Sequence, residues 1–245
     1  MDPDQSKFAL HAAAREGKVT VVESLLNADP KQARKKDDDG RLPIHWAASS
    51  NQPDIVQLLA QQKDFDPDIE DDSGWTPLMI AASVKDGEKL VSLLLGWGAD
   101  VNQTSEYHVP VDIDNSGQTA LHFVASKNHI EIARLLFNNK PPSSARVRDK
   151  RGQYPLHRAA AVGSVPMINL LVKNKSPLNA TDSTGYTALH HAVAEGHGAA
   201  AVALIKAGAE TDKKDADGFL ALDLSPDREV RKYIEREAEN EGIDL

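Results

Sequence analysis

Histidine is the residue type in this sequence with the most obvious capacity for chemistry, because an imidazole can ligate a metal or exchange a proton near neutral pH. The chain has nine histidines. Five of them recur at one place in a repeated pattern, at His11, His45, His122, His157 and His190, and Met79 and Asp223 take that place in two further copies. Zinc needs three or four ligands that converge on one point, whereas one histidine per repeat forms a line. We therefore interpret the five as hydrogen-bonding groups between a helix and the neighbouring loop.

Other patterns that could support catalysis or ion binding are also weak. The sequence has no cysteine and no G-x-S-x-G or glycine-rich phosphate-binding motif. His190, His191 and His197 lie close together but lack the i, i+4 pairing of a helical zinc site. The acidic run from Asp64 to Asp72 lacks the twelve-residue calcium loop with its central glycine. We predict that the protein is not an enzyme and that it holds no metal and no cofactor.

The feature that organises the chain is a glycine followed four residues later by an aliphatic residue. This pattern begins at Gly40, Gly74, Gly117, Gly152, Gly185 and Gly218, with separations of 34, 43, 35, 33 and 33 residues. It includes phrases such as Trp75-Thr76-Pro77-Leu78. A period near 33 with this phrase is typical of the ankyrin repeat, in which a turn and two antiparallel helices form one stacking unit. Such stacks present an extended binding surface.

The period predicts an all-α ankyrin-repeat solenoid of about seven helix-turn-helix repeats with short β-hairpin turns. We expect a single domain over residues 1–245, with repeats at approximately 4–36, 37–70, 71–111, 112–148, 149–181, 182–214 and 215–245. Prolines fit the helix starts, where a missing N–H costs little: Pro43, Pro77 and Pro155 for first helices, Pro53 and Pro166 for second helices. The degenerate first repeat and the charged last helix, near Asp227 to Glu241, fit terminal caps.

Charge and composition narrow the setting in which the protein acts. The net charge of −9 argues against binding to nucleic acid or anionic membranes, and no apolar run is long enough to span a membrane. The absence of cysteine fits a reducing compartment, so we expect a cytoplasmic and nuclear monomer. Residues 64–114 carry a net charge of −10 and residues 127–158 a net charge of +6. Either these patches arise by chance, or they fit a partner of reverse polarity.

One interval between repeats is about nine residues longer than the others. Part of this surplus falls in Val84 to Glu88 and most of it in Gln103 to Ile113. Insertions in repeat stacks become surface loops, often on the binding face. The insertion is either a neutral longer loop or a partner contact through Tyr107 and His108.

Recognition remains as the function that this architecture favours. Side chains at the turn tips and on the exposed side of each first helix point into the concave face, and aromatic residues there are good contact candidates. Trp75, Tyr186 and Phe219 are such residues, whereas Trp46 reads as a core residue and Trp97 as a loop residue that covers a helix end. The predicted partner-binding residues are Asp39, Arg41, Asp72, Trp75, Ser126, Lys127, Arg151, Arg158, Tyr186 and Glu195.

Several phrases resemble the gankyrin family, including its fungal members. They are Asp39-Gly40-Arg41 leading to His45-Trp46-Ala47, Asp71 to Leu78, Ala125-Ser126-Lys127-Asn128 with Glu131-Ile132-Ala133, and His157 to Ala161. These ankyrin-repeat proteins are assembly chaperones of the 26S proteasome regulatory particle. The animal form also carries an L-x-C-x-E segment linked to the retinoblastoma protein. The matching positions here are His191, Val193 and Glu195, so that activity is not expected.

The resemblance implies a concave surface that grips the C-terminal domain of one proteasomal base ATPase. Arg41 and Lys127 match positions expected to meet acidic residues of that ATPase, and Asp39 and Asp72 would face basic ones. The bound protein would support assembly of the base and obstruct premature docking on the core particle. The alternative is a generic ankyrin adaptor or inhibitor that binds a kinase or a transcription factor.

Overall fold

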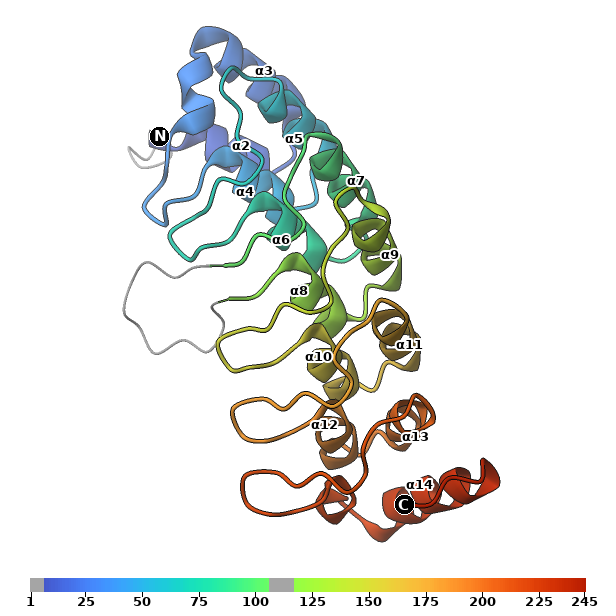
Figure 1. Ribbon diagram of the computed structural model, residues 1–245. Coiled ribbons are helices and arrows are strands. Elements are labelled where there is room, and N and C mark those ends of the chain that lie inside the picture. Colours follow the sequence, from blue (N-terminus) through green and yellow to red (C-terminus); the bar gives the residue numbers. More distant parts are fainter. Residues whose placement is uncertain (1–6, 106–116) are drawn as a thin grey trace. The chain divides into compact units, whose positions relative to one another are not determined.

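A computed structural model describes residues 7–105 and 117–245 of the chain (Figure 1). These residues form short helices joined by loops, and the only β-bridge among them pairs Lys214 with Leu220. The all-α ankyrin fold is confirmed, with the hairpins present as closed loops and without strands in the described ranges. The chain divides into two compact units, residues 1–120 with 134–142 and residues 121–133 with 143–245. The single domain and its seven boundaries stay a prediction.

The first unit stacks consecutive helical pairs side by side. First helices α2, α4 and α6 contact one another in order, and second helices α3, α5 and α7 form a second row beside them (Figure 1). The elements are α2 (Ala9–Arg15), α3 (Val19–Ala28), the 3₁₀ helix η1 (Pro30–Arg34), α4 (Pro43–Ser49), α5 (Pro53–Ala60), α6 (Pro77–Ser83), α7 (Glu88–Gly96) and the end of α9 (Ile130–Asn138).

The second unit repeats this arrangement and ends in a modified pair. Helix α10 contacts α12, which contacts the 3₁₀ helix η2, while α11, α13 and α14 follow one another in the outer row. Its elements are α8 (Ala120–Lys127), the start of α9, α10 (Pro155–Ala161), α11 (Val165–Lys173), α12 (Ala188–Ala194), α13 (Gly198–Lys206), η2 (Ala221–Leu224) and α14 (Arg228–Asn240). The charged last helix is confirmed, and Asp227 caps it by accepting the Val230 N–H at 2.9 Å.

Residue choice explains where the helices begin and how closely they pack. Prolines 43, 53, 77, 155 and 166 all lie in the first turn of a helix, as predicted. Adjacent alanine pairs in the first helices, such as Ala47 with Ala48 and Ala159 with Ala160, are fully buried. Such small side chains let neighbouring helices approach closely, so the core is thin and made of alanine and leucine.

Each ordinary hairpin is organised by one aspartate three residues before the turn glycine. In these hairpin aspartates Oδ1 accepts the backbone N–H groups two and four residues ahead, at 2.8–3.1 Å. Because a short side chain that accepts local N–H groups favours a turn, this one residue type fixes the loop in every copy. The hairpin aspartates are Asp37, Asp71, Asp149, Asp182 and Asp215.

The repeated histidines join successive repeats, as predicted. Nε2 lies 2.9–3.4 Å from a carbonyl oxygen of the following loop in all five, with partners that include Ile69 for His45 and Ala180 for His157. In His45 and His157, Nδ1 accepts a backbone N–H from the start of the same helix at 3.0 Å. An imidazole that accepts at Nδ1 and donates at Nε2 is neutral.

Because these neutral imidazoles are buried, we expect the protein to lose stability in mild acid. Burial lowers the pKa of His122 and of His157 to about 4, whereas the pKa of a histidine in the unfolded chain is near 6.5. Between these values the unfolded chain binds more protons, so stability falls as pH falls. From pH 7 to pH 5, each of the two is expected to cost about 2 kcal/mol.

Urea unfolding at the two pH values measures this loss directly. His157→Gln removes one titrating ring, so its stability should drop less between pH 7 and pH 5 than that of the wild type. An identical drop in both proteins would contradict a role for His157 in the acid response.

The surplus residues fall in both of the places predicted. The positive-φ residue of the helix connection, Asp86, lies eight residues after Leu78, whereas the corresponding Asn51 lies seven residues after Ile44, so Val84 to Glu88 holds one extra residue. Most of the surplus falls in the next hairpin, which closes between Ser105 and Gln118, where the Ser105 N–H donates to the Gln118 carbonyl at 2.8 Å. Twelve residues separate this pair, against three between Asp71 and Trp75. Tyr107 and His108 lie outside the described residues.

Candidate functional site

In the first unit, two predicted acidic contacts lie at neighbouring hairpin tips. Asp39 and Asp72 are exposed, and the Asp72 N–H donates to the Asp39 carbonyl oxygen at 3.2 Å. Lys36 Nζ approaches Asp72 Oδ1 at 3.8 Å, with both side chains at least half exposed. Such an exposed pair contributes little to stability, so both carboxylates are available to a basic partner.

Arg41 is built into the fold more firmly than its position at a hairpin suggests. Its Nε donates to Asp71 Oδ2 at 2.9 Å, and the side chains are 28 % and 1 % exposed. Arg41 is therefore half-buried and not freely exposed, and its contact with a partner stays a prediction. Its reversal to Glu would place two carboxylates together and disturb the fold, so loss of binding in that variant would not isolate a partner contact.

Trp46 lies at the surface and not in the core, which corrects a second expectation. Its indole N–H donates to Asp37 Oδ2 at 2.6 Å, and the guanidinium groups of Arg15 and Arg41 each lie 5.1 Å from its ring. Trp46, Asp37 and Arg15 line a hollow that also includes Phe8 and His11. The Trp46 ring is half-buried, contacts two cations and has its N–H hydrogen-bonded, which suits a contact surface.

The other two tryptophans lie where they were expected. Trp75 is half-buried at its hairpin. Trp97 follows the end of α7, is 41 % exposed and meets Phe65 edge to face at 5.9 Å.

In the second unit, Arg158 serves the hairpin beside it. One of its Nη atoms donates to Asp149 Oδ2 at 2.9 Å, with side-chain exposures of 23 % and 0 %. Arg151 is half-buried at the same hairpin, and its carbonyl accepts the Ser183 N–H at 2.8 Å. The main contact of Arg158 is therefore structural, with the buried carboxylate of its hairpin, and only part of its side chain is exposed to a partner.

Tyr186 belongs to a polar network around Asp182. His191 Nε2 and Gln153 Nε2 lie 2.9 Å and 3.0 Å from Asp182 Oδ2, and the Tyr186 ring meets His191 edge to face at 5.4 Å. Burial alone would raise the pKa of Asp182, but hydrogen bonds from Thr184, Gln153 and His191 hold that pKa well below its usual range. The carboxylate therefore stays charged and fixes the surface on which Tyr186 is displayed.

The remaining predicted residues lie at the ends of two first helices, and a further contact candidate, Phe219, lies on a hairpin. Lys127 and Glu195 are exposed at the ends of α8 and α12, while Ser126 is half-buried and donates through Oγ to the Phe123 carbonyl at 2.9 Å. Phe219 is 51 % exposed at its hairpin. Of these residues, Lys127 is the cleanest test of a charged contact, because it has no structural role comparable to that of Arg41 or Arg158.

Sequence reasoning missed the hairpin aspartates, although their signal is plain. The pattern Asp-x-x-Gly recurs in five repeats, and in four of them, all but that of Asp215, the second carboxylate oxygen takes a donor from one of two fixed places. One is nine residues ahead, in the following helix, as in the pairs Asp37–Trp46, Asp149–Arg158 and Asp182–His191. The other is the preceding hairpin, as in Arg41–Asp71 and Gln153–Asp182. In the third repeat the residue nine ahead is Ile80, which explains why Asp71 takes Arg41 instead.

Two observations bear on other classes of site. Within residues 7–105 and 117–245, no group of three or more His, Asp or Glu side chains is placed to hold a metal ion. In the same ranges, no helix has the length and apolar character needed to cross a membrane.

Comparison with known proteins places this geometry in a family. Models for ankyrin repeats match residues 10–105 and 139–215, and residues 105–159. A Saccharomyces cerevisiae protein described as probable 26S proteasome regulatory subunit p28 is 40 % identical over 94 % of this chain and 98 % of its own length. The chain belongs to the gankyrin family. A second relative, an ankyrin repeat-containing protein of Schizosaccharomyces pombe, is 41 % identical over 85 % of this chain and 86 % of its own length.

Solved structures support the fold of this gankyrin-family chain. The ankyrin repeat domain of human ASB11 covers 93 % of the chain and 96 % of its own length, with a TM-score of 0.78 and 19 % identity. The ankyrin repeat domain of Bcl-3 covers 92 % and 97 %, with a TM-score of 0.70 and 24 % identity. At these identities the likeness concerns the ankyrin fold alone.

Proposed function

We propose that this protein is a non-enzymatic chaperone for assembly of the 26S proteasome regulatory-particle base, acting in the cytoplasm and nucleus. The observation that carries the proposal is the 40 % identity to the yeast regulatory subunit, which extends over nearly all of both chains. In this role the protein binds the C-terminal domain of one base ATPase and blocks premature docking on the core particle.

The described surfaces support a partner of mixed charge. Exposed Asp39 and Asp72 in the first unit suit basic side chains, and exposed Lys127 in the second unit suits acidic ones. Trp75 and Tyr186 are half-buried and held by their hairpins, so they offer apolar area at little entropic cost. Binding should weaken as salt is added, since exposed charges are screened over about 8–10 Å at physiological ionic strength.

A matched pair of charge reversals tests the proposal. Lys127→Glu should lower recovery of base ATPases from a cell lysate by about tenfold or more, because apposed like charges cost several kcal/mol. Lys173→Glu makes the same change at the exposed end of α11, in the outer helical row of the same unit, and should leave recovery unchanged. Recovery should include base ATPases but not complete 26S particles.

Two outcomes would contradict this function. Recovery of a kinase or transcription factor without base ATPases would support the adaptor alternative. Equal loss with both variants would remove Lys127 from the interface.

A further inference from the structure

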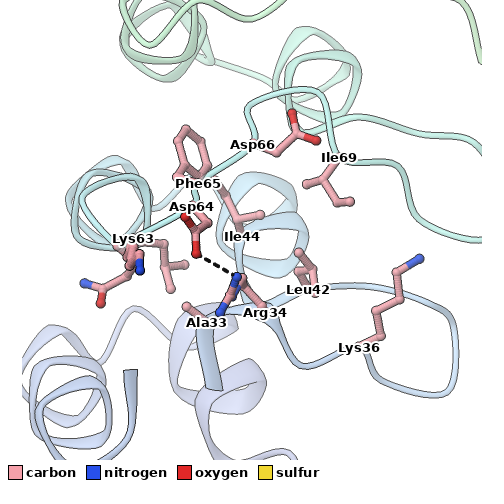
Figure 2. A pocket seen from close by; sticks show the side chains of 12 residues that line it. Ala33, Arg34, Lys36, Leu42, Ile44, Lys63, Asp64, Phe65, Asp66 and Ile69 are labelled. Carbon is pink, nitrogen blue, oxygen red and sulfur yellow. Dashed lines mark hydrogen bonds and ion pairs between the residues drawn. The ribbon is translucent and has the colours of Figure 1, made fainter. Parts of the chain in front are cut away.

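A small cavity in the first unit adjoins the hairpin tip of Asp72, because Lys36, which approaches that carboxylate, also lines it. Its volume is about 150 Å³, and its apolar walls are Ala33, Leu42, Ile44, Leu59, Phe65 and Ile69 (Figure 2). A cavity of about this volume is large enough to hold a benzene ring. The space therefore matches one large apolar side chain.

An unusual loop after α5 creates the cavity. Asp64 has a φ of 59°, and the corresponding residues Gly98, Lys175 and Gly208 also have positive φ. The next residue is small in those repeats, namely Ala99, Ser176 and Ala209, but here it is Phe65. Each small residue donates its N–H back to the preceding helix at 3.0–3.1 Å. The described hydrogen bonds include no equivalent from the Phe65 N–H. Helix α5 ends four residues before Asp64, whereas α7 ends two residues before Gly98. This repeat also holds one residue more before the loop, since Asn51 and Asp64 are 13 residues apart and Asp86 and Gly98 are 12 apart. The extra residue and the large phenyl ring leave the loop standing away from the helix.

The rim of the cavity carries an excess of positive charge on a chain whose net charge is −9. Arg34, Lys36 and Lys63 line it together with Asp64 and Asp66, and Figure 2 shows Lys36 and Lys63 on opposite sides of the apolar walls. Arg34 pairs with Asp64 at 3.1 Å, and Lys36 approaches Asp72 at 3.8 Å. All four side chains are at least half exposed, so both pairs can open without much cost.

We propose that this cavity binds a partner segment in which one large apolar side chain, such as Phe or Leu, is flanked by carboxylates. The apolar side chain enters between Leu42, Leu59 and Phe65, and the flanking carboxylates meet Lys36 and Lys63. None of the predicted ATPase contacts lines this cavity, although Lys36 also approaches one of them, Asp72, so the cavity can serve a second protein.

Methyl NMR of the full-length protein tests the proposal with capped pentapeptides. The probe has a central phenylalanine between pairs of glutamates, one control replaces the glutamates with lysines, and another replaces the phenylalanine with alanine. The acidic probe should shift the methyl signals of Leu42, Ile44, Leu59 and Ile69 with a Kd on the order of 1–10 mM. Both control peptides should bind at least about fivefold more weakly. The methyl groups of Leu156 and Ile168, buried in the second unit, should not move.

Two variants separate a filled cavity from a damaged fold. Ala33→Leu places side-chain volume inside the cavity and should abolish the shifts, with an unchanged or higher melting temperature as its check on folding. Lys63→Glu alters only an exposed rim charge and should weaken the acidic probe by about fivefold or more. The proposal is overturned if the four methyl signals stay fixed at about 10 mM acidic probe, if the lysine peptide binds equally well, or if Lys63→Glu has no effect.

Discussion

Gly185→Ala is expected to destabilise the protein by about 3 kcal/mol. Gly185 has a φ of +81°, a conformation that costs an L-residue about 1–2 kcal/mol. An added Cβ would also lie 2.5 Å from the backbone nitrogen of Ala216, whose N–H donates to the Thr184 carbonyl at 3.1 Å. Backbone cannot swing aside as a flexible side chain can, so the next hairpin must shift and that bond must weaken.

Gly218→Ala provides a matched control in the same unit. Gly218 is the corresponding glycine of the last repeat and has a φ of +88°, but nothing lies within 4 Å of its ideal Cβ. Its substitution should cost only the backbone strain of about 1–2 kcal/mol. Urea unfolding of the two variants therefore isolates the contact between hairpins. Equal losses would mean that the Gly185 turn relaxes freely against the next repeat.

Arg158→Met is expected to cost about 3–5 kcal/mol, the range seen when one partner of a buried ion pair is removed. The substitution keeps most of the aliphatic volume but removes the Arg158 cation from the fully buried Asp149 carboxylate. The backbone N–H groups of Arg151 and Gln153 still donate to Oδ1. The loss should therefore fall toward the lower end of that range.

A double-mutant cycle identifies the origin of this loss. Asp149→Asn removes the charge while keeping an acceptor for the two backbone N–H groups. In that background Arg158→Met should cost clearly less than it does alone, with stability measured by urea unfolding. If its cost is the same in both backgrounds, the effect comes from packing of the arginine and not from a stranded charge.

The sequence was sufficient to predict the fold because the residues that determine each repeat lie close together in the sequence. The turn glycines, the prolines at helix starts and the repeated histidines all occupy the places that the period predicts. The surplus between Gly74 and Gly117 was also divided correctly between the helix connection and the following hairpin, and the Ser105–Gln118 hydrogen bond shows where that hairpin closes.

The side chains of the candidate site were harder to predict, because their partners are remote in sequence. Arg41 reads as an exposed tip residue until its partner Asp71, 30 residues away, is seen to be buried. Trp46 reads as core because large aromatic residues on helices often pack inward, but Asp37 offers its indole N–H an acceptor at the surface. The cavity beside Phe65 exists because the loop after α5 does not pack against that helix, and no local sequence pattern predicts this.

The hairpin between Ser105 and Gln118 has a practical consequence for protein engineering. Elsewhere an aspartate ties each turn through N–H groups two and four residues ahead, which fixes the loop length. Here Ser105 Oγ accepts the Gln118 N–H at 3.2 Å, thirteen residues ahead, so closure does not depend on a set number of intervening residues. This segment is a natural graft point, where an epitope or fluorescent tag can be exchanged for the existing residues while the helical layers on either side keep their packing.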